Sequence, residues 1–314
     1  MKKLPLILLG FIFTLSAYCQ TSHPEFPILA DDVRQTLFYL SSDSLQGRDS
    51  GSEGIGEAAA YIENIFITAG VNPFFQTYKD TLANFDKPSF NIVGFIEGND
   101  SVLKKEWVIL GAHYDHIGII SPLNGDSIAN GANDNAAGVT AVLSLAKHFA
   151  QSKSNKRSLM FVLFSAEEKG LLGSKHFAKR IKSSNLDIYT MLNFEMIGVP
   201  MKETPGKAYL TGFDLSNMAQ KINEYAGEEL VVKLAKAEEF NLFRRSDNLP
   251  FYEKLKIPAQ TISTFDFTNY PYYHQVDDEA EWMDTTSMTV LINQMIVVVE
   301  NMANSLKKEI RLHE

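Results

Sequence analysis

The apolar run from Leu159 to Phe164 is the feature that most restricts how this chain can fold. Six consecutive apolar residues leave no polar face, which is typical of a strand covered on both sides in a parallel sheet. Two adjacent glutamates, Glu167 and Glu168, follow shortly after the run. Like charges repel at this separation, so the sequence raises the question of which positive charge lies beyond the end of this strand.

Segments with strand-like and helix-like patterns alternate along the chain. Helical periodicity predicts helices over 31–40, 55–69, 135–151, 171–182 and 285–306, and apolar runs predict further strands over 90–96, 107–112, 189–197, 207–211 and 259–264. This alternation predicts an α/β fold, a three-layer α/β/α sandwich with a largely parallel mixed central sheet. Ligand sites in such sheets lie beyond the carboxyl ends of the strands.

The first nineteen residues have the pattern of a secretory signal peptide. Two lysines precede the apolar stretch Leu4 to Ala17, which is too short to span a bilayer as a helix. Small residues then predict cleavage before Gln20. A lipid-modified Cys19 is the alternative, although Tyr18 is large for the position before such a cysteine. We therefore expect a secreted or periplasmic protein with no membrane span.

Composition excludes several classes of chemistry. Cys19 is the only cysteine, so cleavage before Gln20 would leave no disulfide, cysteine ligand or cysteine nucleophile. The net charge is −9 and no basic tract or nucleic-acid-binding motif is present, so we do not expect nucleic acid as a partner. After the signal peptide (1–19), we expect an N-terminal helical segment (20–74) that packs on a catalytic domain (75–314).

Histidine and carboxylate clusters stand where expected strands end or helices begin. Imidazole and carboxylate groups suit zinc, and a catalytic zinc keeps an open position for water. Two zinc ions that share a bridging carboxylate need about five protein ligands. Two bound dications would also make the adjacent glutamates favourable. The predicted ligands are His113, Asp134, Glu168, Glu195 and His274.

Other interpretations exist for single members of this set. Asp134 precedes an expected helix and could be only its N-cap. Glu167 and Glu168, followed by a lysine, could be a solvated turn. Glu195 is harder to explain in this way, because an unpaired buried carboxylate inside an apolar strand costs several kcal/mol.

Two histidines compete for one ligand position. His116 lies three residues after His113, in the sequence His113-Tyr114-Asp115-His116. We favour His113 as the ligand, with Asp115 holding its other ring nitrogen, as second partners of ligating histidines commonly do.

Taken in order, several motifs resemble those of the M28 family of zinc peptidases, in its co-catalytic aminopeptidase group. The matching stretches are AHYDHIG, GDSIANGANDNAAGV, FSAEEKGLLGS, NFEMIG and PYYH. The earlier stretch LSSDSLQGRDSGSEG is similar to the segment that precedes the catalytic domain in bacterial members. The resemblance extends over roughly residues 30 to 300 and implies a zinc exopeptidase-like fold. Residues 75 to 107 leave no room for the protease-associated insert of longer members.

The resemblance also implies roles for individual residues. The five predicted ligands match the family's metal ligands with Asp134 as the bridge, Glu167 matches the general base, and Asp115 matches the acid that orients the first histidine. The residues alone do not tell which glutamate is the base. The implied function is that of a secreted exopeptidase with two Zn2+ per chain, most simply an aminopeptidase that acts on peptide or protein N-termini. A glutaminyl cyclase-like acyltransferase with one zinc, an inactive binding protein and a carboxypeptidase are the alternatives.

Two positions depart from the family pattern. Glu195 stands where relatives usually carry aspartate, and its additional methylene moves the carboxylate by ~1.5 Å. In Ser246-Asp247-Asn248, asparagine replaces the usual histidine of a Ser-Asp-His sequence. Ser246 and Asp247 can also be interpreted as a helix N-cap.

Overall fold

A nine-stranded mixed sheet forms the centre of the computed structural model, which describes residues 26–313. The signal peptide expected over 1–19 lies outside the described residues. The strand order is β1 (Asn72–Pro73), β3 (Phe90–Ile96), β7 (Ser158–Phe164), β4 (Glu106–His113), β8 (Asp187–Phe194), β11 (Ala259–Ser263), β9 (Ala208–Leu210) and β10 (Val231–Val232), and β2 (Lys79–Thr81) pairs with β3.

The middle of the sheet is parallel. Strands β7, β4, β8 and β11 run in the same direction, whereas β3 and β9 join this group in antiparallel pairs. Every residue of β7 is buried, and alternate side chains enter different cores: Phe161 packs on one side of the sheet and Val162 on the other. The apolar run in the sequence therefore correctly predicted a strand covered on both faces.

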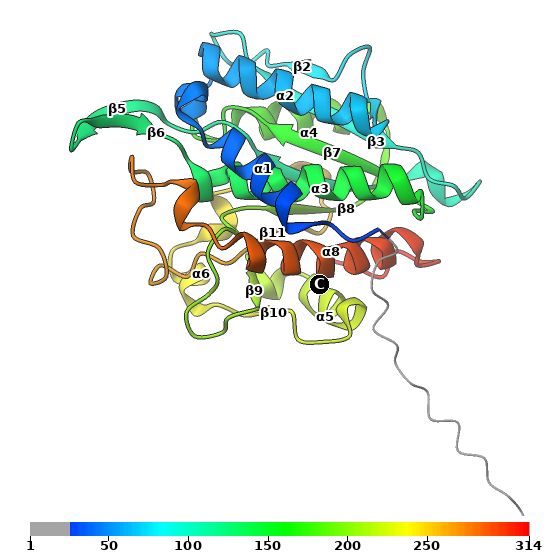
Figure 1. Cartoon of the computed structure of the whole chain (residues 1–314). Coiled ribbons are helices and arrows are strands. Elements are labelled where there is room, and N and C mark those ends of the chain that lie inside the picture. The colour runs from blue at the N-terminus through cyan, green and yellow to red at the C-terminus, as the bar shows by residue number, and fades with distance from the viewer. Residues whose placement is uncertain (1–25, 314) are drawn as a thin grey trace, which may run out of the picture.

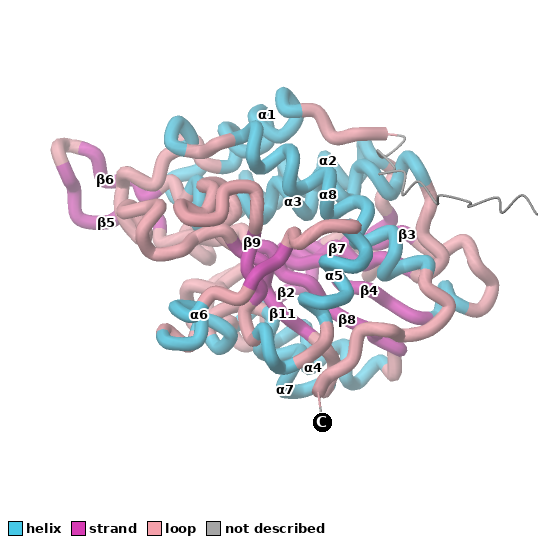
Figure 2. The backbone as a smooth tube through the Cα atoms, turned by 90° about the horizontal axis from the view of Figure 1, so that it is seen from below, coloured by secondary structure: helices cyan, strands magenta, loops and turns pink. Residues whose placement is uncertain are grey.

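Helices cover both faces of the sheet, which confirms the three-layer architecture (Figures 1 and 2). One layer contains α1 (Ala30–Leu40), α2 (Glu53–Ala69), α3 (Ala137–Ser152), α5 (Met218–Ala226) and α8 (Thr285–Asn304). The opposite layer contains α4 (Leu172–Ser184) and α7 (Asn248–Leu255), which pack against each other. The short helix α6 (Ala235–Glu239) lies near β9.

The N-terminal helices are part of the first layer. Helix α1 packs against α3 and α8, and α2 packs against α3. The connection between α1 and α2 carries Arg48, whose buried guanidinium donates hydrogen bonds to the carbonyls of Leu40, Tyr114, Asn130 and Gly131. This side chain ties the connection to the loops that follow β4 and precede α3. A domain boundary at residue 74 stays a prediction.

Among the differences from the sequence-based expectation, two concern segments near the ends of the central strands. Strands β5 (Gly118–Leu123) and β6 (Asp126–Ala129) form a hairpin that projects from the body of the molecule (Figure 1). The pair Asn124-Gly125 at its tip is the sequence signal for this hairpin. The strand expected over 189–197 ends at Phe194, because the chain leaves the extended conformation and Met196 adopts φ 49°. Glu195 therefore lies just beyond the strand.

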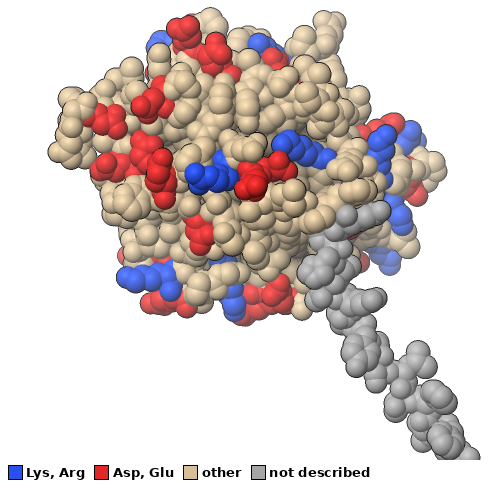
Figure 3. All heavy atoms as spheres, viewed as in Figure 1, with Lys and Arg blue, Asp and Glu red and all other residues tan. Residues whose placement is uncertain are grey.

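Charged side chains of both signs are interspersed on the face that carries α1 and α8 (Figure 3). Within residues 26–313, no helix has the length and apolar character needed to cross a membrane.

Candidate metal centre

The carboxyl ends of the parallel strands bring the five predicted ligands together. His113 ends β4, Glu168 follows β7, and Glu195 follows β8. Asp134 lies in the irregular turn before α3, and His274 lies in the loop after β11. Their donor atoms form two groups, each within 4.8 Å: His116, Asp134, Glu168 and His274, and His113, Asp134 and Glu195. Asp134 belongs to both groups, as a bridging carboxylate must.

The distances within these groups fit zinc. His113 Nε2 lies 3.3 Å from Asp134 Oδ1 and 3.8 Å from Glu195 Oε1. His274 Nε2 lies 3.2 Å from both Asp134 Oδ2 and Glu168 Oε1. Both nitrogens are buried and form no hydrogen bond with the described residues. Donor atoms that surround a zinc ion at about 2.0–2.2 Å are roughly 3–4 Å apart, so these atoms are arranged to share an ion.

Electrostatics in the metal-free protein also favour a cation at this position. Burial alone would lower the pKa of His113, but the carboxylates of Glu167, Asp134 and Glu195 raise it well above its usual value. Burial would likewise lower the pKa of His274, but the carboxylates of Asp134 and Glu168 raise it to about 10. Burial would raise the pKa of Asp134, but His113 and His274 hold it well below its usual range. Bound dications would take the place of the positive charge that protonated His113 and His274 carry in the metal-free protein.

The turn after β7 presents both glutamates to this centre. Ala166 adopts φ 58°, so the chain leaves the strand direction directly before Glu167 and Glu168. Consecutive side chains on a regular strand would point to opposite faces. Burial raises the pKa of the Glu167 carboxyl well above its usual value, and the nearby carboxylates of Glu195 and Asp247 act in the same direction.

Asp115 differs from the predicted arrangement. We expected its carboxylate to hold the second ring nitrogen of His113. Instead, His113 Nδ1 lies 3.1 Å from the main-chain carbonyl oxygen of Asp115, and the carboxylate is 3.9 Å away. The carboxylate is occupied elsewhere: it accepts hydrogen bonds from the amides of Glu167 and Glu168 and from Ser50 Oγ. Asp115 thus orients His113 through its main chain and holds the glutamate turn through its side chain.

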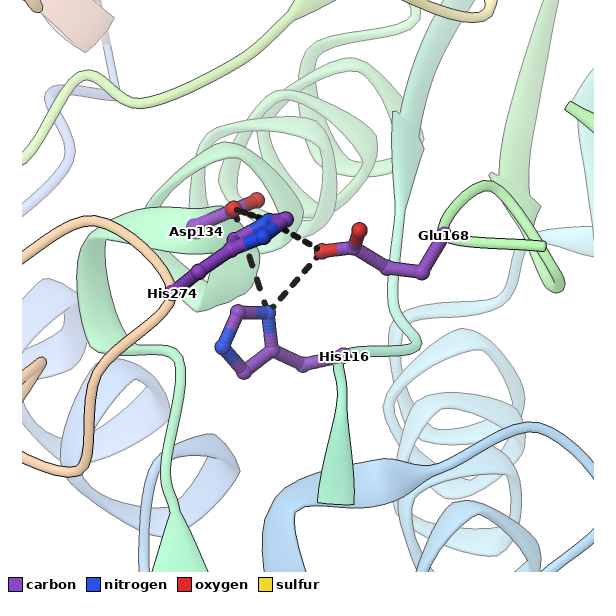
Figure 4. A group of neighbouring side chains, drawn as sticks. All are labelled: His116, Asp134, Glu168 and His274. Carbon is purple, nitrogen blue, oxygen red and sulfur yellow. Dashed lines mark hydrogen bonds and ion pairs between the residues drawn. The ribbon is translucent and has the colours of Figure 1, made fainter. Parts of the chain in front are cut away.

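The two competing histidines both enter the centre. His113 belongs to the group with Glu195, as favoured, and His116 belongs to the other group. The buried His116 directs Nδ1 toward Glu168 Oε1, 3.1 Å away, and Asp134 Oδ2, 3.9 Å away (Figure 4). His116 was not among the five predicted ligands. Its signal in the sequence is the three-residue spacing from His113 where a strand ends.

Asp278 supports the bridging residue, although it was not among the predicted site residues. Its carboxylate accepts hydrogen bonds from the amides of Asn133 at 2.8 Å and Asp134 at 3.1 Å, and from the Tyr270 hydroxyl at 2.7 Å. The turn that presents Asp134 is therefore fixed by a second buried carboxylate. The side chain of Asp134 faces the histidines, and the N-cap position of α3 is Ala136, so the N-cap interpretation is wrong.

The departures from the family pattern also have structural explanations. Ser246 Oγ donates a hydrogen bond to Glu195 Oε2 and accepts one from Asn193 Nδ2 at 2.9 Å, which fixes the longer carboxylate. Asp247 occupies the N-cap position of α7, as one interpretation of the sequence expected, but its side chain makes no capping hydrogen bond. The Asn248 side chain joins the loop before α7 to β11 by donating to the Phe243 carbonyl and accepting from Thr261.

A pocket opens beside Glu195. Aromatic side chains line part of it, and hydroxyl groups and the exposed Arg245 line the rest. Tyr273, one of the aromatic residues, stacks on the ring of His274 with the two centroids 3.9 Å apart. The pocket is placed to receive a side chain of a bound ligand next to the metal centre. Its lining includes Met196, Tyr209, Phe265, Phe267 and Tyr273.

Known structures share this fold at low sequence identity. The LapA aminopeptidase of Legionella pneumophila superposes with a TM-score of 0.69 at 20% identity, covering 89% of this chain and 73% of LapA. A zinc aminopeptidase from Bacillus subtilis gives a TM-score of 0.69 at 15% identity, covering 92% and 99%. Glutaminyl cyclase from Porphyromonas gingivalis gives 0.68 at 15% identity, covering 87% and 98%. At these identities the similarity is one of fold.

Sequence comparisons identify the family. A probable leucine aminopeptidase of Arthroderma otae is 33% identical over 149 residues, which is 46% of this chain and 37% of that protein. A probable zinc metalloprotease of Pyrenophora teres f. teres is 33% identical over 186 residues, covering 54% and 39%. The matches thus span well under two thirds of these relatives. The family model described as Peptidase family M28 matches residues 91–299, more than half of the 314 residues, and the chain therefore belongs to peptidase family M28.

Proposed function

We propose that this protein is a zinc-dependent exopeptidase, and specifically an aminopeptidase with two Zn2+ per chain. The observation that carries the proposal is the position of Asp134 between two donor groups, with Glu167 buried beside them. Five ligands match the set expected for two ions, and Glu167 remains free to act on a proton. Family membership and the names of the relatives agree with this interpretation.

The residues divide the work of hydrolysis. Bound zinc would supply Lewis acidity and lower the pKa of a coordinated water toward ~7. Glu167 accepts the proton of the attacking water and passes it to the leaving amine. The pocket beside Glu195 receives a substrate side chain next to the scissile bond.

A glutaminyl cyclase is the second candidate, because its fold matches over nearly the whole chain. The complete second donor group of His113, Asp134 and Glu195 favours two ions and a peptidase. Peptides with free and blocked N-termini, followed by mass spectrometry of the products, separate the candidates. An aminopeptidase removes single residues from free N-termini only. Loss of ammonia from N-terminal glutamine identifies a cyclase, shortening from the other end identifies a carboxypeptidase, and unchanged peptides indicate a binding protein.

The proposed site of action is outside the cytoplasm, in the periplasm or the medium. The proposal is based on the signal-peptide pattern of residues 1–19. We predict that the exported protein begins near Gln20, because the preceding apolar stretch is too short to remain as a membrane anchor. N-terminal sequencing of exported protein checks this, and recovery of a lipid-modified Cys19 would contradict it.

A further inference from the structure

We infer that His116 is an additional ligand of the metal position formed by Asp134, Glu168 and His274. The inference rests on the zinc centre of the proposed function and adds a sixth protein ligand to the five predicted ones. It makes the two metal positions chemically different.

The geometry of His116 resembles that of the other ligands. Its Nδ1 lies 3.1 Å from Glu168 Oε1 and 3.9 Å from Asp134 Oδ2. The corresponding distances are 3.2 Å for His274 with the same two carboxylates and 3.8 Å for His113 with Glu195. Donors around one zinc ion are roughly 3–4 Å apart, so His116 Nδ1 stands at the distance of a ligand.

The main chain fixes the His116 ring in this position. Its amide donates a hydrogen bond to the carbonyl of Arg48, and it forms a β-bridge with Asp49. On the other side lies Gly131, where a Cβ atom would come within 2.6 Å of the ring. The ring is fully buried and stands edge-on to His274. Within residues 26–313, the hydrogen bonds and ion pairs of the His116 ring all go to Glu168 and Asp134.

The competing interpretation is that His116 only donates a hydrogen bond to Glu168. The two interpretations require different tautomers of the His116 ring. A ligating Nδ1 must offer its lone pair, which places the proton of neutral imidazole on Nε2. A donating Nδ1 carries the proton itself. The hydrogen bond accounts for the 3.1 Å distance but not for the approach to Asp134, which is too long for a hydrogen bond. A shared ion accounts for both distances.

The two metal positions then differ in openness. The position of His116 has four protein donors, two of them imidazoles, and the other has His113, Asp134 and Glu195. Four protein ligands are typical of structural zinc sites, and three ligands with an open position are typical of catalytic ones. Glu195 also lines the pocket, so the more open position is the one next to it. The four-donor position should fill first and release its metal last.

The test compares the full-length wild type with His116→Gln and with His148→Gln as a matched control. His148 is also a buried histidine, but its Nδ1 contacts the main-chain carbonyl of Phe26. Metal-free proteins are titrated with Co2+, whose absorption reports its ligands. Loss of an outer partner typically weakens metal binding by 10–100-fold. We expect His116→Gln to weaken the tighter position by at least ~100-fold and to change its spectrum, while the second position and the control stay unchanged.

A second measurement uses the unsubstituted protein and does not depend on how the variant folds. Nitrogen-15 NMR of histidine in the zinc-loaded protein should show the His116 proton on Nε2. A proton on Nδ1, an unchanged cobalt spectrum, or equal affinities in wild type and His116→Gln would each overturn the assignment while leaving the peptidase proposal intact. A wild-type chain that binds no metal would overturn both.

Discussion

At the scale of single residues, Glu167 and Glu168 are chemically identical neighbours with different proposed tasks. Glu168 Oε1 lies within 3.2 Å of ring nitrogens of both His116 and His274, as expected for a ligand. Glu167 belongs to neither donor group, and its pKa is raised by burial. The two carboxylates are therefore distinguished by their surroundings alone.

We predict that Glu167→Gln keeps both metals but loses turnover. An amide cannot accept the proton, so kcat should fall by on the order of 10²–10⁴-fold or more, while KM changes little because substrate contacts survive. Glu168→Gln should instead lose zinc and activity together. Zinc content measured beside kcat for both variants checks the assignment. Metal loss in Glu167→Gln with full metal in Glu168→Gln would show that the roles are reversed.

Glu195 provides a second residue-scale prediction. Glu195→Ala should weaken binding of the metal shared with His113 and Asp134, because it removes one of three donors. Glu195→Asp should retain substantial activity, since the family resemblance implies aspartate at this position. Metal affinity and rate are measured for both variants. If Glu195→Ala matches the wild type in both quantities, this residue is not a ligand.

The sequence was most informative where a side chain that can bind metal also stands at a predicted strand end. Histidine or carboxylate at or shortly after the end of an apolar run, as at His113 and at the pair Glu167 and Glu168, could be placed near the centre from the sequence, but which glutamate is the ligand came only from the family resemblance. The Ser246–Glu195 hydrogen bond could not, because it joins residues on separate elements whose approach depends on tertiary packing. The hydrogen bonds of the Asp115 carboxylate could not be predicted for the same reason, because the amides that it binds lie beyond a different strand.

At the scale of elements, the contact between α2 and the turn at 43–48 is connected to the metal centre through the residues that follow in the chain. Gly54 in α2 lies against the main chain of Leu45, and the same turn leads to Arg48 and Ser50. Arg48 donates hydrogen bonds to carbonyls of the loops that carry ligands, and Ser50 Oγ donates one to the Asp115 carboxylate. The position of α2 is therefore linked to the geometry of the site.

We predict opposite effects of alanine at two glycines of α2. A Cβ at Gly54 would lie 1.8 Å from the Leu45 carbonyl oxygen, so Gly54→Ala should destabilise the fold by about 1–3 kcal/mol. At the exposed Gly56 nothing lies within 4 Å, so Gly56→Ala should stabilise the helix by up to about 1 kcal/mol. Denaturant unfolding measures both. Equal stabilities for the two variants would mean that the turn at 43–48 moves away without cost. That result would contradict the proposed link between the position of α2 and the metal centre.

At the scale of the whole molecule, the ligands come from segments spread from His113 to His274 and meet only in the folded sheet. An ion bound by this set favours the folded state over the unfolded one by mass action, by ~2.7 kcal/mol when free metal is a hundredfold above its Kd. The described part of the chain also has large apolar cores on both sides of the sheet, which do not depend on metal.

We therefore predict that a chelator abolishes activity and lowers Tm without unfolding the protein at room temperature. Returned zinc should restore both, with about two ions per chain by elemental analysis. Circular dichroism and scanning calorimetry follow the fold, with and without chelator. Active protein that contains no metal would end the metallopeptidase proposal.

The spacing of the ligands along the chain has a consequence for synthesis. His274 follows the last strand of the sheet, and α8 comes after it. A chain emerging from the ribosome N-terminus first carries His113, Asp134, Glu168 and Glu195 long before His274 is made. Until then one metal position lacks a ligand. The proposed peptidase activity therefore requires nearly the whole polypeptide, and we expect products that end before His274 to be inactive.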